Sequence, residues 1–195
     1  LPQKIKAIRL FEQAGVEMVR AGTVATPASI SNFNKMAGIL DLPIRQWEWY
    51  RPISSPNQKG QLSPSCLQDL VNNILKTRDK IDKSLIIANA VPFCAISNPN
   101  LLNAASTGAW FDEGHTRLVV DPRGYAKPHY FLDQNIGDPI DIAACWHHDF
   151  MQSMRNMEFL PKSCQDCIFR YKCRGGSRFE AEKKYGYYQA LDPLA

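Results

Sequence analysis

Three of the six cysteines lie within ten residues of one another near the end of the sequence. Cys164 and Cys167 are separated by two residues, so both thiolates can reach one metal centre from a single turn, and Cys173 follows after five more residues. Cysteines at such spacings bind iron–sulfur clusters or zinc. Basic side chains nearby favour thiolates over thiols and offset the negative charge of a cluster. These are Arg170, Lys172, Arg174 and Arg178.

Three interpretations of this cysteine run remain open. An iron–sulfur cluster would take three cysteines plus a remote or non-protein fourth ligand. A zinc site would normally show a fourth Cys or His at a second paired spacing, and none follows Cys173. The cysteines could also be inert or bonded to one another. The other three, Cys66, Cys94 and Cys145, stand alone, and without a visible secretory signal they do not resemble a disulfide framework.

Composition excludes several broad classes of protein. The 195 residues are 45% hydrophobic and 22% charged, as in a folded domain. A net charge of +4 is too small to indicate binding to nucleic acid or to a membrane surface. No apolar run approaches the roughly 20 residues of a membrane span. We therefore expect a cytoplasmic protein, and the first residue, Leu1, suggests a preceding segment.

Helices and strands alternate in the first half of the sequence. Apolar spacing and breakers predict strands at 16–24, 44–50 and 84–91. The same reasoning predicts helices at 3–14, 29–40 and 63–80. This order indicates parallel strands joined by right-handed crossovers. Three such units are too few to close a barrel, so we expect a partial α/β layer over residues 1–91.

The pattern changes after Pro92, and we place a second domain at residues 92–195. A long Asn- and Ser-rich loop is expected at 95–115. A β-hairpin is expected at 117–131, around an Asp-Pro-Arg-Gly turn. Helices are expected at 141–155 and at about 176–185, on either side of the cysteine run. The second domain is therefore expected to be small and of the α+β class.

The cysteine run resembles the signature of SPASM domains. Cys164-x2-Cys167-x5-Cys173-x-Gly175-Gly176 is similar to their Cys-x2-Cys-x5-Cys-x3-Cys pattern with its Gly-Gly. These auxiliary iron–sulfur domains are attached to radical S-adenosylmethionine (radical SAM) enzymes that modify peptides and proteins. Residues 114–129 resemble the hairpin of these domains, and the first half resembles the later part of a radical SAM barrel. The resemblance implies an α/β fold: the end of a partial (β/α) barrel, followed by a SPASM or twitch domain.

Departures from the family pattern point to a reduced domain. Phe111, His129 and Ser177 stand where the family has cysteines that serve a first auxiliary cluster. The resemblance then implies a single 4Fe-4S cluster of the twitch type, bound by Cys164, Cys167 and Cys173. The family's last cysteine is missing as well. Its place as the fourth ligand could be taken by substrate, by solvent, by a carboxylate such as Asp192 or Glu180, or by Cys94, the best protein candidate.

The loop that cleaves S-adenosylmethionine is also missing. Radical SAM enzymes need a Cys-x3-Cys-x2-Cys loop for a second 4Fe-4S cluster, and the sequence has no such spacing. The chain alone should therefore be inactive, and S-adenosylmethionine would bind only in a full-length parent enzyme. The resemblance implies a peptide or protein substrate and an electron donor such as ferredoxin or flavodoxin. The alternative is a non-catalytic zinc- or cluster-binding module used in interaction or assembly.

Three residues of the first half are candidates for binding the cofactor. Arg20 and Thr23 lie on a predicted strand whose counterpart in the family faces S-adenosylmethionine. Arg51 ends the next strand, and barrel sites gather at the C-terminal ends of strands. A structural role for each residue, on the surface or in the barrel wall, is the alternative that the sequence leaves open.

Overall fold

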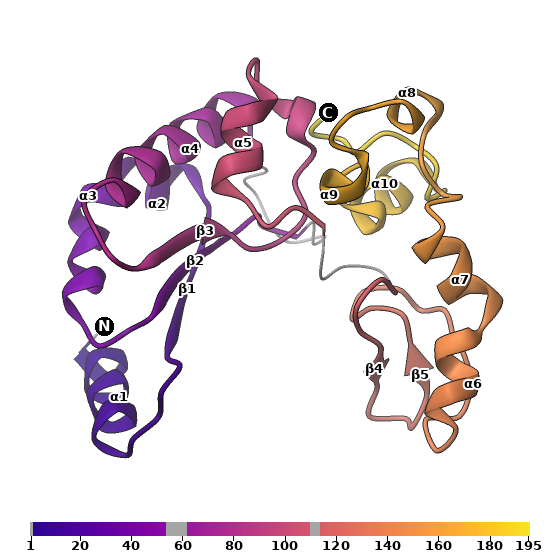
Figure 1. The fold of residues 1–195 in the computed structure, drawn as a ribbon, viewed down its shortest axis with the longest axis horizontal. Helices are drawn as coiled ribbons and strands as arrows, with labels where there is room; N and C mark the ends of the chain where they lie inside the picture. Colours follow the sequence, from indigo (N-terminus) through magenta and orange to yellow (C-terminus); the bar gives the residue numbers. More distant parts are fainter. Residues whose placement is uncertain (1, 54–61, 110–113) are drawn as a thin grey trace. The chain divides into compact units, whose positions relative to one another are not determined.

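The computed structural model of the chain describes residues 2–53, 62–109 and 114–195. The chain divides into two compact units (Figure 1). Unit 1 comprises Leu1–Ala88 and Ala95–Thr107, and unit 2 comprises Asn89–Cys94 and Gly108–Ala195. Among the described residues, no helix combines the length and the apolar character needed to cross a membrane.

Unit 1 is built on a parallel sheet of three strands in the order β1-β2-β3. The strands are β1 (Arg20–Val24), β2 (Gln46–Tyr50) and β3 (Ser84–Ile87). Each pair is parallel, and Gln46 lies opposite both Arg20 and Ser84. The predicted α/β class with parallel strands is therefore confirmed. Each strand is shorter than the apolar run that predicted it.

The helices of unit 1 precede, connect and follow these strands. They are α1 (Pro2–Gln13), α2 (Pro27–Ser31), α3 (Phe33–Met36), the 3-10 helix η1 (Ala37–Asp41), α4 (Pro64–Arg78) and α5 (Pro99–Ala105). The single helix predicted at 29–40 is broken at Asn32, whose side-chain amide donates to the Ala28 carbonyl at 2.8 Å. This side chain competes with the backbone for helical carbonyls, which favours a break at that residue.

Tryptophans of β2 form the core between the sheet and its helices. Trp47 and Trp49 are fully buried, and their ring centroids lie 5.1 and 5.3 Å from that of Phe33 in α3. In Figure 1, α4 and α5 lie on one side of the sheet. The buried residues of α4 recur at helical spacing and complete this layer: Leu67, Leu70, Val71 and Ile74. Burial of such large rings is a main source of stability in a unit of this size.

The segment 95–107 differs from the long loop expected there. It contains α5, which begins with Pro99 after the Asn98 side chain caps the N–H of Asn100 at 3.2 Å. The Thr107 N–H then donates to the Ile87 carbonyl at 2.9 Å, next to a bridge between Ile87 and Ser106. These contacts place the segment in unit 1, whereas the sequence placed the domain boundary at residue 91.

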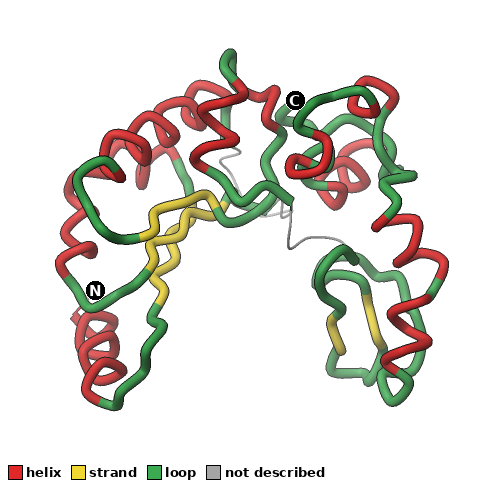
Figure 2. The backbone as a smooth tube through the Cα atoms, in the orientation of Figure 1, coloured by secondary structure: helices red, strands yellow, loops and turns green. Residues whose placement is uncertain are grey.

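Unit 2 consists mainly of loops between short helices, as the green and red segments of Figure 2 show. Its elements are the 3-10 helix η2 (Phe93–Ala95, whose last residue belongs to unit 1), strands β4 (Val119–Val120) and β5 (Ala126–Lys127), and helices α6 (Ile142–His147), α7 (Asp149–Arg155), α8 (Lys162–Gln165), α9 (Arg170–Cys173) and α10 (Arg178–Tyr185). The predicted hairpin is present as β4 and β5, and the Asp121 carboxylate accepts from the N–H groups of Arg123 and Tyr125. The helix predicted at 141–155 is broken at His148, whose Nδ1 accepts from the Phe150 N–H.

Candidate functional site

The cysteine run forms two successive turns in unit 2. Cys164 lies in α8, and its carbonyl accepts from the Cys167 N–H at 3.3 Å. The Cys167 carbonyl accepts in turn from the Arg170 N–H at 3.0 Å, which starts α9 and brings the chain to Cys173. Arg174, Gly175 and Gly176 then adopt positive φ angles of 50°, 74° and 78°. These left-handed residues reverse the chain immediately after the last cysteine of the run.

A remote segment of the chain joins this run at Cys173. The buried Cys173 Sγ accepts from the Phe93 N–H at 3.4 Å, across 80 positions of sequence. The rings of Phe93 and Phe169 pack edge to face, 5.6 Å apart between centroids. These two contacts hold residues 89–94 against the cysteine run, with Cys94 directly after the contacting Phe93.

The thiol groups of this region affect one another electrostatically. Burial raises the pKa of Cys94, and negative charge on Cys164, on Asp192 and on Cys167 raises it further. Burial also raises the pKa of Cys173 to about 11, and Cys94 contributes to that rise. Such effects fall off with distance. Cys94 therefore lies within electrostatic range of Cys164, Cys167 and Cys173.

Two of the four basic residues near the run, Arg174 and Arg178, bind backbone carbonyls, whereas Arg170 interacts electrostatically with Cys167. The Arg174 guanidinium donates to the Met154 carbonyl, and that of Arg178 donates to the carbonyls of Gly175, Tyr188 and Ala190. Burial outweighs any stabilisation of a thiolate at Cys173, because its pKa rises rather than falls. A metal that binds this sulfur would have to displace the thiol proton.

Binding of a cluster or of a single metal ion at this run stays a prediction. Within residues 2–53, 62–109 and 114–195, no three His, Cys, Asp or Glu side chains are close enough to hold one metal ion. All six cysteines are free thiols, so none is paired in a disulfide. A tetrahedral zinc site needs its ligands about 2.3 Å from one centre.

The carboxylate of Asp192 has a structural role beside this region. Its Oδ2 accepts from the Ser177 N–H at 2.7 Å and its Oδ1 from the Leu194 N–H at 2.9 Å. Oδ2 thus ties the C-terminal segment to the turn after Cys173, and Oδ1 orders the C-terminal segment itself. Glu180, the other carboxylate considered as a ligand, is buried in α10.

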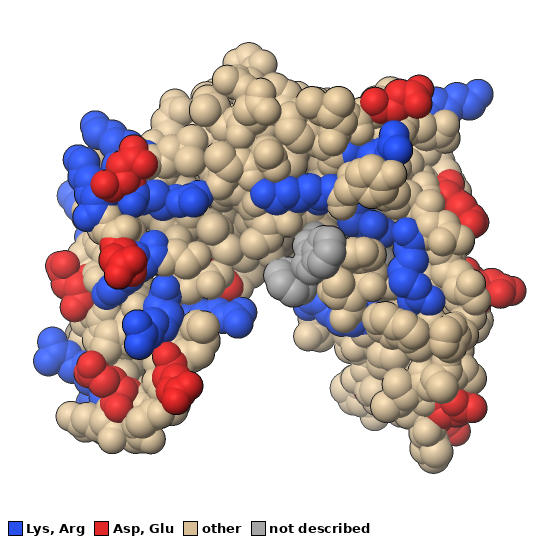
Figure 3. Space-filling model, viewed as in Figure 1, with Lys and Arg blue, Asp and Glu red and all other residues tan. Residues whose placement is uncertain are grey.

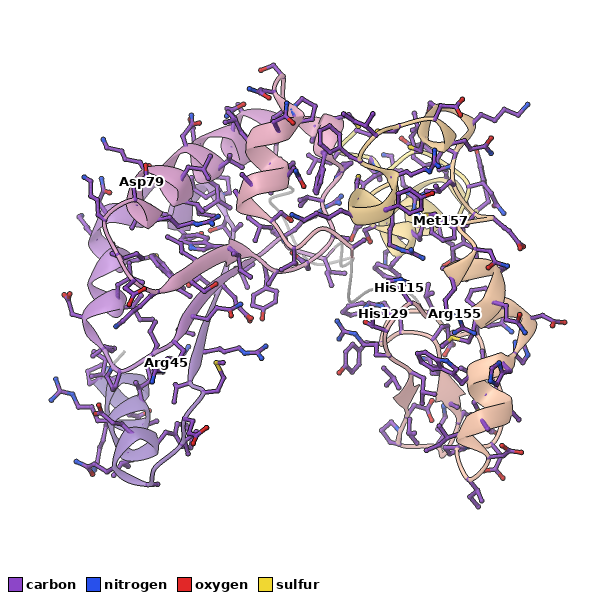
Figure 4. All side chains as sticks on the ribbon, viewed as in Figure 1. Arg45, Asp79, His115, His129, Arg155 and Met157 are labelled. Atoms are coloured by element: carbon purple, nitrogen blue, oxygen red, sulfur yellow. The ribbon has the colours of Figure 1, made fainter. Side chains whose placement is uncertain are left out.

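Ser177 and His129 stand where the SPASM pattern has further cysteines, and both make contacts within unit 2. Ser177 caps α10 by accepting from the Glu180 N–H at 3.3 Å. The His129 ring packs against Tyr130 and Phe131, with centroids 5.6 and 5.4 Å away. His115 and His129 come together at the end of the hairpin, because the Gly114 N–H donates to the Pro128 carbonyl (Figure 4). Phe111 lies outside the described residues.

Gly108 packs closely against the backbone of Lys172, which lies in the cysteine run. Its φ is +66°, and a Cβ placed on it would overlap the Lys172 carbonyl, which accepts from the Ala109 N–H at 2.9 Å. We expect Gly108→Ala to lower the free energy of unfolding by about 1–2 kcal/mol for the left-handed backbone, and further for the steric overlap. Thermal unfolding followed by circular dichroism measures this loss.

Gly124→Ala is the matched control for this prediction. Gly124 also lies in unit 2 with a positive φ, +86°, but a Cβ there would meet no atom within 4 Å. Its replacement should therefore show the backbone strain alone. Equal losses for the two variants would contradict close packing of residue 108 against the cysteine run.

A second polar group lies on the face of the sheet in unit 1 that is opposite Trp47 and Trp49. The Glu48 carboxylate of β2 is buried and accepts from the Gln46 side-chain amide at 2.7 Å and from the Tyr50 hydroxyl. Arg20 of β1 forms an ion pair with it at 3.5 Å and keeps an exposed side chain. Parallel sheets are usually covered on both faces. This polar face is therefore a candidate binding surface, and Glu48 is the member that sequence reasoning missed.

The candidate cofactor-binding residues do not share one face of the sheet. Thr23 lies on the tryptophan-bearing face, where its hydroxyl accepts from the Trp47 indole N–H at 2.9 Å. Arg20 lies on the opposite face with Glu48. Arg51 follows β2 and is buried. The geometry brings Arg20 to the polar face and separates Thr23 from it, and binding of a cofactor by these residues stays a prediction.

Thr23→Val tests the structural role of this hydroxyl. The change removes the acceptor of the buried Trp47 N–H, so we expect a loss of about 1–3 kcal/mol in the free energy of unfolding. Thr23→Ser keeps the hydroxyl and should retain most of that energy. Urea unfolding of the two variants gives the comparison, and equal stability would show that the hydrogen bond contributes nothing.

Comparison with solved structures places this architecture among known folds. SuiB of Streptococcus suis matches with a TM-score of 0.70 and 17% identity, over 98% of this chain and 49% of SuiB. SuiB bound to S-adenosylmethionine matches with a TM-score of 0.67 and 16% identity, over 98% of this chain and 48% of that one. The chain shares their fold. anSMEcpe with bound AdoMet also matches, with a TM-score of 0.61 and 17% identity, over 96% of this chain and 52% of anSMEcpe.

These likenesses define the fold and its extent. The chain spans about half the length of the solved structures that it matches. No protein-family model matches the sequence, and no curated protein matches it. Identities of 16–17% therefore show a shared fold and do not show a shared activity.

Proposed function

We propose that this chain is the C-terminal portion of a radical SAM enzyme with a twitch-type auxiliary domain. Cys164, Cys167 and Cys173 would bind one 4Fe-4S cluster, with Cys94 as the fourth ligand. The observation that carries the proposal is the contact of Phe93, the neighbour of Cys94, with Cys173 of the cysteine run, in a fold shared with S-adenosylmethionine-binding proteins. The parent enzyme would modify a side chain of a peptide or protein by radical chemistry.

The neighbouring structures support the choice of cofactor and substrate class. SuiB has been solved bound to S-adenosylmethionine, and anSMEcpe with AdoMet and a Cp18Cys peptide. A peptide substrate for this chain is proposed by analogy with that complex. The missing Cys-x3-Cys-x2-Cys loop implies that S-adenosylmethionine is cleaved by another part of the parent enzyme.

Each part of the chain has a proposed task. A bound 4Fe-4S cluster supplies single-electron exchange. Cys164 and Cys167 lie partly exposed, and Cys173 lies buried beside Phe93, so one side of the site is open and the other is protected from water. In unit 1, the exposed Arg20 guanidinium is positioned by Glu48 and could hold a carboxylate of the substrate or of S-adenosylmethionine.

Anaerobic reconstitution tests the proposal directly. After incubation with ferrous iron and sulfide, we expect about four irons and four sulfides per chain, with broad visible absorbance from thiolate-to-iron charge transfer. A parallel incubation with zinc examines the alternative of an assembly module. Tight uptake of one zinc per chain, without uptake of iron, would contradict the proposed function.

A further inference from the structure

We infer that a row of aromatic side chains on unit 2 is a docking surface for an acidic, extended segment of a partner protein. The inference goes beyond the proposed function, because this surface needs neither a cluster nor S-adenosylmethionine. The surface is called the aromatic row below, and its residues come from the hairpin region and from α10. They are Arg117, His129, Tyr130, Phe131, Phe179 and Lys183.

Four rings form the row in a continuous series of contacts. The His129 ring packs against both Tyr130 and Phe131, with centroid distances of 5.6 and 5.4 Å. The Phe131 ring packs in turn against Phe179 of α10, at 5.1 Å between centroids. Tyr130 is 61% exposed and Phe131 is 43% exposed, although the two residues are adjacent in the chain. Two neighbouring aromatic side chains in solvent offer the apolar centre of an interface.

The core of unit 2 holds this centre in place. Leu132, directly after Phe131, is fully buried in a hydrophobic cluster that includes Phe159. Phe179 packs against the same cluster from α10. The hairpin side and the α10 side of the row are therefore both anchored in one core. Rings that are already ordered lose little conformational entropy when a partner binds.

A basic side chain lies over the ring at each end of the row. The Arg117 guanidinium carbon is 5.9 Å from the centroid of Tyr130, and the Lys183 ammonium nitrogen is 5.6 Å from that of Phe179. The negative face of an aromatic ring attracts a cation at such distances. A partner that covers the rings therefore meets positive charge at both ends of the row.

Nearby acidic groups leave this positive charge in excess. Of the two acids in α10, Glu180 is buried and Glu182 is partly exposed. The Asp133 carboxylate forms ion pairs with Arg123 and Lys127, at 3.1 and 3.0 Å. On the visible face of unit 2 in Figure 3, Lys and Arg side chains gather between α10 and the hairpin. The row therefore favours a partner with acidic rather than basic side chains.

The length of the row limits the segment that fits it. Five successive contacts of 5.1 to 5.9 Å lead from Arg117 to Lys183. An extended chain advances about 3.3 Å per residue, so a segment of at most about eight residues contacts both cations. Such a segment carries apolar side chains in its middle and acidic side chains toward its ends.

An NMR titration of the full chain, without iron, tests this surface directly. The probe is the unlabelled peptide Asp-Glu-Val-Leu-Val-Leu-Glu-Asp, and the control peptide has lysine in place of the four acids. We expect the acidic peptide to shift the amide signals of residues 117, 129–131, 179 and 183. The lysine peptide should leave these signals unchanged, because its ends are repelled by the two cations.

Charge reversal at the ends of the row gives the matched variants. Arg117→Glu and Lys183→Glu should each weaken binding of the acidic peptide at least about fivefold, because the new carboxylate repels its ends. Tyr130→Ala should weaken it by a similar factor through loss of apolar contact. Lys162→Glu is the control, since Lys162 is an exposed base of α8 in the same unit but outside the row.

Several outcomes would overturn the docking assignment. They are equal binding of the two peptides, binding of neither, unchanged affinity in both charge-reversal variants, or an equal loss in Lys162→Glu. If sedimentation equilibrium shows a wild-type dimer that Tyr130→Ala dissociates, the row joins two copies of this chain and the acidic segment is again overturned. Iron uptake is measured separately, and its failure bears on the proposed function alone.

Discussion

Replacement of Cys167 by serine is expected to abolish iron uptake during anaerobic reconstitution. Cys167 is one of two partly exposed cysteines in the run, and its loss would leave an iron of the cluster without a thiolate. A serine hydroxyl does not ionise readily enough to replace it, because the thiolate is the form of cysteine that binds metal. Iron content should fall from about four per chain to near zero, with loss of the visible absorbance. Cys164→Ser and Cys173→Ser should behave in the same way.

Cys66→Ser is the control for this experiment. Cys66 lies in the first turn of α4 in unit 1, where its N–H donates to the Ser63 hydroxyl at 3.2 Å. It is a free thiol outside the cysteine run, so its replacement should leave iron uptake unchanged. If the Cys66 variant loses iron as completely as the Cys167 variant, the iron is not bound at the proposed site.

Cys94→Ser distinguishes the possible fourth ligands. If Cys94 ligates the cluster, the variant should bind iron less tightly and give a cluster that chelators remove faster. If substrate, solvent or a carboxylate completes the site, iron uptake and cluster lifetime should match those of the wild type. The raised pKa of Cys94, due first to burial and then to Cys164, is consistent with its place in this neighbourhood but does not decide between the two results.

The sequence contained most of the information for the sheet of unit 1. Apolar runs and helical spacing depend on local burial, so they predicted the alternation of helices with the three parallel strands. The helix break at Asn32 and the presence of α5 were missed. Both depend on individual side-chain hydrogen bonds, from Asn32 to Ala28 and from Asn100 to Asn98, which periodicity does not detect.

The candidate site was predictable as a group of residue types but not as a geometry. Spacing alone predicted that Cys164, Cys167 and Cys173 share one metal centre, and this stays a prediction. The approach of Cys94 follows from long-range contacts of Phe93 with Cys173 and Phe169, and no local pattern encodes these contacts. The polar face around Glu48 was missed although the strand sequence places this acid between two tryptophans. In a strand, such alternation indicates that the acid lies on the face opposite the tryptophans.

The basic residues illustrate the limit of sequence reasoning most clearly. A count of nearby charges predicted that Arg174 and Arg178 would stabilise thiolates. Their guanidinium groups instead bind backbone carbonyls, because a buried carbonyl without a donor is costly. Sequence reveals the presence of a charge, whereas the packing of the unit determines which groups that charge contacts.

Arg178→Ala is therefore expected to destabilise unit 2 strongly. Arg178 is fully buried, and its guanidinium donates to the carbonyls of Tyr188 and Ala190, both at 2.7 Å, and to that of Gly175. Truncation would leave three carbonyls without this donor and open a cavity beside Phe159, whose ring centroid lies 5.9 Å from the guanidinium carbon. We expect a loss of about 3–5 kcal/mol in the free energy of unfolding, measured by urea denaturation.

Arg178→Lys separates charge from geometry at this position. Lysine keeps the positive charge, but its ammonium group cannot span three separate carbonyls as the planar guanidinium does, so an intermediate loss is expected. Hydrogen exchange should localise the damage in the alanine variant to residues 175–190, since Arg178 joins the turn after Cys173 to the C-terminal segment. A loss of less than about 0.5 kcal/mol in the alanine variant, as is usual for surface substitutions, would contradict this prediction. The hydrogen bonds of Arg178 would then contribute little to the stability of the turn after Cys173.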